Sequence, residues 1–205
     1  MKKIVPVCLL CCIFFSAAAQ TKIVADCTVT FSISNKDEAN SNPGSSVKTL
    51  YIKGKLTRSD ISGPSYTQTT IYDNNTGVAT ILREIGANKY MSVFDSVKWK
   101  EQNKQYEELR LTFTSDTKTI LGYECKKAIA QLKSGGMLEL YYAIAIAPSA
   151  IENPYEYKNV PGFLLEYETI AEGNTKKIRY TATSINFNPV PASKFEIPKT
   201  GYRML

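Results

Sequence analysis

The residues best suited to acid–base chemistry are two glutamates, Glu166 and Glu168, which stand two positions apart in a stretch with strand character. In a β-strand such a pair faces one side, about 7 Å apart, and some glycoside hydrolases hold an acid and a base at a similar separation. The same alternation gives Leu165 and Tyr167 to the opposite, buried face. We therefore expect the two glutamates to lie on a solvated sheet face rather than in a catalytic pair.

Chemistry that depends on histidine is excluded, because none of the 205 residues is histidine. Its absence removes Ser-His-Asp and Cys-His catalysis, histidine-ligated zinc and the usual general base at neutral pH. No glycine-rich phosphate-binding pattern occurs either. From these absences we expect that the protein is not an enzyme and that it uses no cofactor and no metal.

The N-terminal residues have the pattern of a secretory signal peptide. Two lysines at positions 2 and 3 precede an apolar run over residues 4–15 and small residues over 16–19. This pattern is typical of a cleaved export signal, and the apolar run is too short to span a bilayer. We expect residues 1–19 to be removed and the protein to act in the periplasm or outside a bacterial cell, without a transmembrane segment.

Two of the five cysteines, Cys27 and Cys125, lie outside this predicted signal peptide. In an oxidising compartment such a pair is either a disulfide or two buried thiols. A disulfide would close a loop of about 100 residues and contribute roughly 4 to 5 kcal/mol by constraining the unfolded chain. The sequence leaves both alternatives open.

Aromatic residues gather in the second half of the chain, where strands alternate apolar and small side chains. Tyrosine combines an apolar ring with a polar hydroxyl, which suits a cavity wall or an interface. A sheet that curls around such a face either encloses a cavity or simply fills a core. Trp99, the single tryptophan, is either a cap packed on the rim or a gate over the cavity. The candidate ligand-binding residues are Trp99, Tyr123, Tyr141, Tyr142, Phe163 and Tyr167.

The elements that position these residues are short strands joined by turns rich in Gly, Asn and Pro. Residues 96–108 alone lack strand character and predict a short helix or a loop. Because almost no helix is predicted between the strands, a parallel βαβ sheet is excluded, and a sheet of this size is expected to curl. We predict one mainly β domain over residues 20–205, a curled antiparallel sheet forming a half-open barrel of about ten or eleven strands with little helix. The predicted strands are residues 22–33, 47–59, 66–72, 78–85, 89–95, 109–114, 118–121, 123–133, 137–146, 163–172 and 175–187.

Four segments resemble a known group of proteins: residues 120–128 (ILGYECKKA), the pair Tyr141-Tyr142, residues 160–166 (VPGFLLE) and the ending FEIPKTGY at 195–202. They resemble exported proteins of the GLPGLI and related uncharacterised families of Bacteroidetes. That resemblance implies a LolA-like, lipoprotein-carrier-like half-barrel, whose concave face would hold acyl chains. It implies no functional residue at any position here.

Taken together, these observations predict an exported binding protein that holds a lipid or another apolar ligand in a half-barrel cavity. The alternative is a non-catalytic structural or interaction protein of the cell envelope with a filled core, which would have a protein partner. The net charge of +6 is spread without a basic run longer than two residues. Nucleic-acid binding, which requires a clustered basic surface, is therefore not expected.

Overall fold

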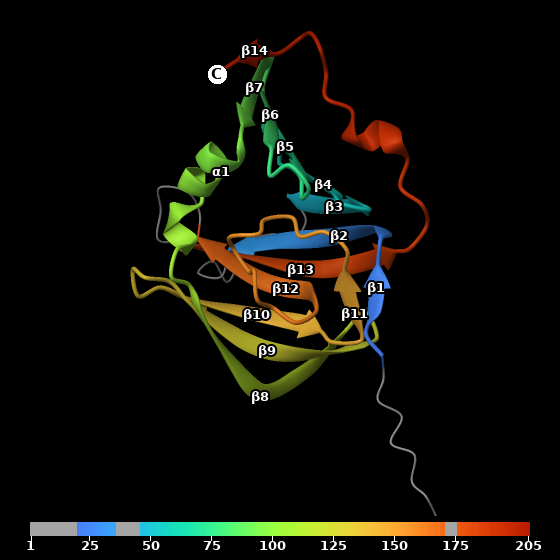
Figure 1. Cartoon of the computed structure of the whole chain (residues 1–205), viewed down its shortest axis with the longest axis vertical. Helices are drawn as coiled ribbons and strands as arrows, with labels where there is room; N and C mark the ends of the chain where they lie inside the picture. Colours follow the sequence, from blue (N-terminus) through green and yellow to red (C-terminus); the bar gives the residue numbers. More distant parts are fainter. Residues whose placement is uncertain (1–19, 36–45, 171–175) are drawn as a thin grey trace, which may run out of the picture.

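A computed structural model describes residues 20–35, 46–170 and 176–205 of the chain. The predicted signal peptide, residues 1–19, lies outside these described residues, as does the turn predicted at residues 173 and 174. The described part of the chain forms a twelve-stranded sheet and a separate two-stranded sheet (Figure 1). The strand order of the large sheet is β14-β7-β6-β5-β4-β3-β2-β13-β12-β10-β9-β8.

The first half of the chain is a run of strands, and those from β3 to β7 are joined by short turns. Each of β2 to β7 pairs antiparallel with the strand before or after it. The strands are β1 (Lys22–Val24), β2 (Asp26–Asn35), β3 (Val47–Lys53), β4 (Leu56–Ser62), β5 (Tyr66–Asp73), β6 (Ala79–Ile85) and β7 (Asn88–Phe94).

The second half begins with the short helices, which follow β7, and then returns to the sheet. In the described residues β13 pairs with β2 and so joins the two halves of the chain. The elements are α1 (Ser96–Gln102), η1 (Lys104–Tyr106), β8 (Arg110–Ile120), β9 (Tyr123–Gln131), β10 (Met137–Ala143), β11 (Ile146–Pro148), β12 (Phe163–Ile170), β13 (Lys177–Asn186), η2 (Ala192–Phe195) and β14 (Arg203–Met204).

The predicted fold class is confirmed: the protein is mainly β, and its large sheet curls without closing into a barrel. Two of the pairings are parallel, β1 with β11 and β14 with β7. The strand count differs from the expected ten or eleven because short strands carry little periodic signal. β14, for example, has only two residues.

One predicted strand, residues 47–59, is in fact a hairpin of β3 and β4. Lys53 pairs with Leu56, so that only two residues form the turn. Gly54 has a φ of +58° there, a conformation that glycine adopts without the steric penalty of a Cβ. The unbroken apolar alternation on both sides of this glycine hides the turn in the sequence.

A similar split occurs in the predicted strand 22–33, which divides into β1 and β2 at Ala25. Val24 is buried and Ile23 is 63% exposed, the reverse of the faces expected from alternation through Ala25. The change of face lets β1 leave the large sheet and pair with β11. Strand prediction was also wrong at residues 109–121, where β8 continues through an irregularity between Phe113 and Thr117.

The main core lies inside the curl of the sheet, between β2, β3, β9, β10, β12 and β13. A smaller cluster packs Trp99 of α1 against Tyr72 and Ile81, and another packs Phe195 of η2 against Ile71. The segment from 149 to 162, here called the covering loop, crosses in front of β2 and β13 (Figure 1). Among the described residues, no helix is both long and apolar enough for a membrane span.

Candidate ligand-binding site

A cavity of about 240 Å³ lies between the concave face of the sheet and the covering loop. Its walls come from β2, β3, β11, β12 and the loop, and most of the surface is apolar. Polar side chains gather at one end: Glu152, Asn153, Glu156, Tyr157 and Tyr167. The principal apolar residues are Phe31, Leu50, Ile52, Pro148, Val160 and Phe163.

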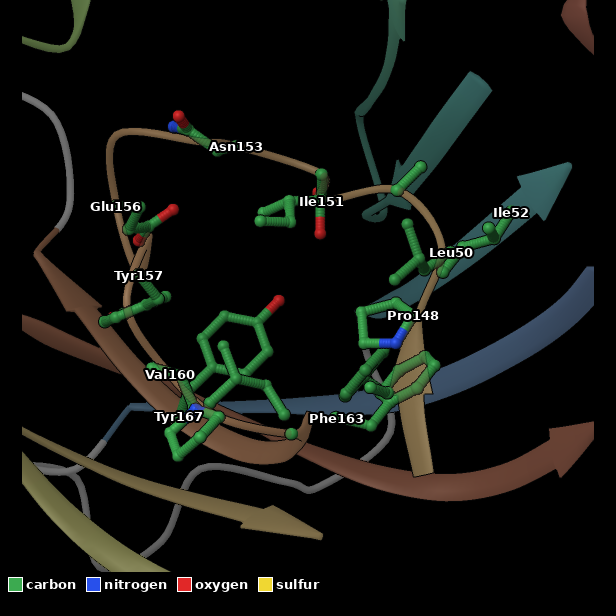
Figure 2. Close-up of a pocket in the computed structure, with 17 residues that line it drawn as sticks. Leu50, Ile52, Pro148, Ile151, Asn153, Glu156, Tyr157, Val160, Phe163 and Tyr167 are labelled. Carbon is green, nitrogen blue, oxygen red and sulfur yellow. The ribbon is translucent and has the colours of Figure 1, made fainter. Parts of the chain in front are cut away.

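Figure 2 shows how these two sets face each other. The Tyr167 hydroxyl and the Glu156 carboxylate point into the same space, and Leu50, Ile52 and Phe163 lie on its other side. Such a cavity, largely apolar with a few convergent polar groups, is the usual form of a small-molecule site.

Hydrogen bonds to the first half of the chain hold the covering loop in place. The amide of Asn74, in the turn after β5, exchanges two hydrogen bonds of 3.1 Å with the backbone of Ile151. Ser149 Oγ donates to the carbonyl of Gly54 at 2.6 Å, and Asn153 donates to Asn103 at 2.6 Å. The loop is therefore tied to hairpin turns and to the helical segment, on both sides of the cavity.

A buried lysine organises the polar end of the cavity. Lys48 of β3 is 5% exposed, and its Nζ lies 2.7 Å from Oε1 of Glu152 and 2.5 Å from the hydroxyl of Tyr167. Burial by itself would lower the pKa of Lys48, but the surrounding groups, of which Glu152 acts most strongly, together outweigh it and raise the pKa above its usual value. The ammonium therefore stays charged inside the fold.

Two stacked tyrosines form the floor beneath this ammonium. The rings of Tyr167 and Tyr180 stack with centroids 5.0 Å apart, and Lys48 Nζ lies 5.2 and 4.9 Å from them. A cation over an aromatic face is attracted by the ring quadrupole, more strongly where water is excluded. Burial also raises the pKa of Tyr167 well above its usual value, so its hydroxyl stays protonated.

Glu156 of the covering loop is the other ionisable group at this end. Its Oε1 accepts a 3.1 Å hydrogen bond from the hydroxyl of Tyr106. Burial raises the pKa of Glu156 to about 7, although Lys48 acts in the opposite direction. The next residue, Tyr157, donates its hydroxyl to the backbone carbonyl of Glu168 on β12, which fixes the loop over the sheet.

Gly162 explains part of the VPGF motif that leads into β12. A Cβ on this residue would overlap the carbonyl oxygen of Ala143 and press on the ring of Tyr142. Only glycine lets the end of the covering loop pass so close to the end of β10. The motif is therefore a packing requirement at the edge of the cavity.

The structure brings two of the six predicted ligand residues to the cavity, Phe163 and Tyr167. Trp99 lies elsewhere, packed on Phe94 and Tyr72 with centroids 5.8 and 6.4 Å away. It therefore occupies the position of a cap on the sheet, the first of its two predicted roles. Ligand contact by Phe163 and Tyr167 stays a prediction.

The other three predicted residues lie on β9 and β10, away from the cavity lining. Tyr142 is buried in the main core, where Phe113 meets it edge-to-face at 5.9 Å. Tyr123 is partly buried against the same core. Tyr141 is also partly buried, with the ammonium of Lys118 4.1 Å from its ring centroid.

The expectation that Glu166 and Glu168 are solvated is wrong. Glu168 is fully buried and Glu166 is 7% exposed. Lys118 Nζ lies 2.6 Å from Oε1 of Glu166, and Arg179 Nη2 lies 2.6 Å from Oε1 of Glu168. Strand alternation correctly separates them from Tyr167, but it does not reveal that long basic side chains cover this outer face.

Cys27 and Cys125 are both free thiols in the structure, and both are completely buried. Burial is the main cause that raises the pKa of Cys27 to about 12 and that of Cys125 to about 11. The structure thus has the second of the two alternatives that the sequence left open. The oxidation state in the native compartment stays a prediction.

Sequence reasoning missed Lys48 and Glu156. Lys48 did carry a signal, since it stands in register with the buried Leu50 and Ile52 on β3. A lysine on the apolar face of a strand requires a buried partner. Glu156 had no comparable signal, because its loop is aperiodic and only the folded chain brings it to Tyr106.

Comparison with known proteins identifies the family. A family model described as the N-terminal domain of N-glycanase peptide matches residues 32–189. No curated protein sequence matches the chain. The resemblance expected from the sequence is thus confirmed for its β-rich fold, but not for the GLPGLI-like or LolA-like assignment.

Solved structures with a similar fold include PNGF-II in two crystal forms. One has a TM-score of 0.51 and 14% identity over 87% of this chain and 30% of that chain. The other has a TM-score of 0.52 and 13% identity, over 88% and 32%. The chain therefore spans about a third of the length of the PNGF-II chains that it matches.

A third similar structure is an uncharacterised conserved protein from Thermus thermophilus. Its TM-score is 0.54, with 9% identity over 89% of this chain and 90% of that chain. At these identities the likenesses show a shared fold.

The expectation that this protein is not an enzyme is overturned by the family match, because the matching family is named for an enzyme, N-glycanase. The absence of histidine excluded particular catalytic mechanisms, and extending that to every enzyme class was the error. The match covers most of the chain, from β2 to the end of β13. The chain therefore belongs to the N-glycanase peptide N-terminal domain family.

Proposed function

We propose that this chain, a relative of the N-terminal domain of N-glycanase, is an exported ligand-binding domain, and that the cavity under the covering loop holds an apolar or amphipathic molecule such as a lipid. The observation that carries the proposal is the cavity itself, about 240 Å³ with mostly apolar walls and polar groups at one end. Residues 1–19 support export by their signal-peptide pattern.

The construction of the walls supports binding rather than a filled core. Leu50 and Ile52 come from β3, and Phe163 from β12, on rigid strands of the sheet. The covering loop is held by hydrogen bonds at its first residue, Ser149, and in its interior, at Tyr157. Preformed walls reduce the ordering cost that a ligand would otherwise offset.

Native mass spectrometry of protein purified from its own envelope tests the proposal. We expect a bound mass that organic extraction removes and that reloading from a lipid extract restores. A protein that stays ligand-free with every extract offered would contradict the proposal.

A cavity-filling variant provides the matched test. Ala147 of β11 lines the cavity, whereas Ala145, two residues earlier, is exposed. Ala147→Phe should abolish loading because its ring occupies the ligand's space, and Ala145→Phe should load normally. Circular dichroism of both variants would verify that they keep the fold.

A second candidate function is interaction with another protein segment at the edge of the sheet. β8 is the last strand of the sheet formed by the described residues, is eleven residues long, and carries Phe113 at 50% exposure. A long edge strand presents backbone groups that pair with an extended peptide. The chain matches only about a third of PNGF-II, and a further domain is one source of such a peptide.

Site-specific crosslinking tests this second candidate. A photoreactive residue at Phe113 should capture a partner in native cells. The same residue at Val97 of α1, which is 77% exposed, should not. Equal capture at both positions, or none at either, would exclude a partner at β8.

A further inference from the structure

The polar end of the cavity presents carboxyl groups, with its lysine placed behind them. Glu152 and Glu156 both line the cavity. Lys48 is engaged by Glu152 at 2.7 Å and by the Tyr167 hydroxyl at 2.5 Å. The buried ammonium of Lys48 is therefore paired with Glu152, and Glu156 is the second carboxylate at this end of the cavity.

That second carboxylate, Glu156, receives a hydrogen bond from a tyrosine hydroxyl. Tyr106 donates to it at 3.1 Å. Among the described residues, no lysine or arginine lies within ion-pair distance of Glu156. A carboxylate in an apolar site without a cation is unfavourable, and it is stabilised by any cation that reaches it.

The chemistry of this end discriminates between ligand classes. A carboxylate or phosphate head would meet Glu152 and Glu156 before it could reach Lys48, so repulsion opposes it. A neutral hydroxyl could accept or donate one hydrogen bond but would not compensate the charge. An ammonium head supplies the positive charge that would pair with Glu156, and it adds hydrogen-bond donors to the one from Tyr106.

We infer that the ligand of this cavity carries an aliphatic ammonium head that binds the carboxylate of Glu156, while its alkyl chain lies against Leu50, Ile52 and Phe163. The inference rests on the proposed function and specifies the chemical class of its ligand. It places the head where Figure 2 shows the Glu156 carboxylate and the Tyr167 hydroxyl facing one space.

Proton competition gives this inference a distinct pH signature. Because the pKa of Glu156 is about 7 in the free protein, a proton and the ammonium compete for one carboxylate. An alkylamine stays protonated throughout this range, like lysine with a pKa of about 10.4. Its affinity should therefore rise about tenfold per pH unit below 7 and level off above it.

The other groups that face Glu156 keep their charge across this range. Lys48 of β3 has a raised pKa, as do Tyr106 of η1 and Tyr157 of the covering loop. Tyr167 of β12 and Tyr180 of β13 also have raised pKa values, which keeps both hydroxyls protonated. Glu152, paired with Lys48, is the remaining acid that faces it.

Isothermal titration calorimetry with three probes of equal chain length tests the inference: decylammonium, decanol and decanoate. At pH 8 we expect decylammonium to bind most tightly. Glu156→Gln should weaken decylammonium about 10- to 100-fold, the range of a charge-assisted hydrogen bond, and should leave decanol unchanged. Glu107→Gln, on an exposed glutamate outside the cavity, is the matched control and should alter none of the three.

The results of this experiment distinguish a failure of the ammonium inference from a failure of the proposed ligand-binding function. If none of the probes binds, the proposed cavity function fails with it. If decanol or decanoate binds as tightly as decylammonium, the cavity stands and the ammonium inference is overturned. Should Glu156→Gln fail to fold, the pH profile of the wild-type protein decides: a decylammonium affinity that is flat from pH 6 to 8 contradicts the inference.

Discussion

Nζ of Lys48 lies 2.7 Å from Oε1 of Glu152, and this ion pair joins the concave face of β3 to the loop that covers the cavity. The two residues lie far apart in the sequence, and the lysine is almost fully buried. The pair therefore helps to hold the covering loop against the sheet, so that loss of either partner should destabilise the fold.

Lys48→Met should lower the free energy of unfolding by about 2 to 4 kcal/mol, because it leaves Glu152 without its cation. The expected loss is smaller than for a fully buried ion pair, because the side chain of Glu152 is partly exposed. Denaturant titration measures the loss. Lys53→Met is the control, on the same strand, because Lys53 and its partner Asp26, at 3.5 Å, are both partly exposed. It should cost less than about 1 kcal/mol.

The double variant Lys48→Met, Glu152→Leu should recover much of that loss, since apolar residues of similar size often replace a buried ion pair without penalty. A double variant no more stable than Lys48→Met would show that the lysine acts through contacts other than Glu152.

Stability should depend on pH through Glu156. Its pKa of about 7 in the folded protein exceeds the value of about 4.3 expected in the unfolded chain. The folded state therefore binds more protons in that interval, so the contribution of Glu156 falls as pH rises from about 4.3 to 7 and is constant above.

Because other acids titrate at low pH, the informative quantity is the difference in unfolding free energy between wild type and Glu156→Gln. That difference should move in favour of the glutamine variant between pH 5 and 7. Parallel curves for the two proteins across this interval would show that Glu156 has an ordinary pKa.

Gly162→Ala should destabilise the protein by about 2 kcal/mol or more, because the added Cβ overlaps the Ala143 carbonyl and the backbone must shift. Gly135→Ala provides the comparison. That residue has a φ of +89° but open space around it, so only the backbone cost of about 1 kcal/mol applies. Thermal and denaturant unfolding of both variants would measure the difference, and equal losses would contradict the steric explanation.

The two cysteines should be inert in the folded protein. Both are buried, with pKa values raised to about 12 for Cys27 and about 11 for Cys125, so neither forms the reactive thiolate near neutral pH. A thiol reagent should label neither in native protein and both after unfolding without reductant. Unfolded protein that does not label until it is reduced would indicate a disulfide instead.

Much of the architecture is present in local sequence patterns. The alternation in β9, β10 and β12 places Leu138, Leu140 and Leu165 on the buried face, as the structure confirms. The stretch at 96–108 without strand character corresponds to α1 and η1. Period-two alternation encodes the two faces of a strand directly, so these features follow from residues close together in the chain.

The positions of turns and the burial of charged side chains were harder to predict from the sequence. The Gly54 turn is hidden because apolar positions continue on both sides of it, and the Glu166–Glu168 pair was misplaced in solvent. Lys118 and Arg179, which cover those carboxylates, come from other strands. Alternation identifies a face, but the neighbours on that face depend on strand order.

The sequence by itself determined a mainly β chain, the absence of histidine chemistry and the inward positions of Phe163 and Tyr167. Only the tertiary structure decided where the polar end of the cavity lies. It brings Lys48 from β3, Glu152 and Glu156 from an aperiodic loop, and Tyr106 from η1 into one place. The reason is that strand periodicity relates residues two positions apart. This site is formed instead by contacts between segments far apart in the sequence, which come together only when the sheet curls and the covering loop packs over it.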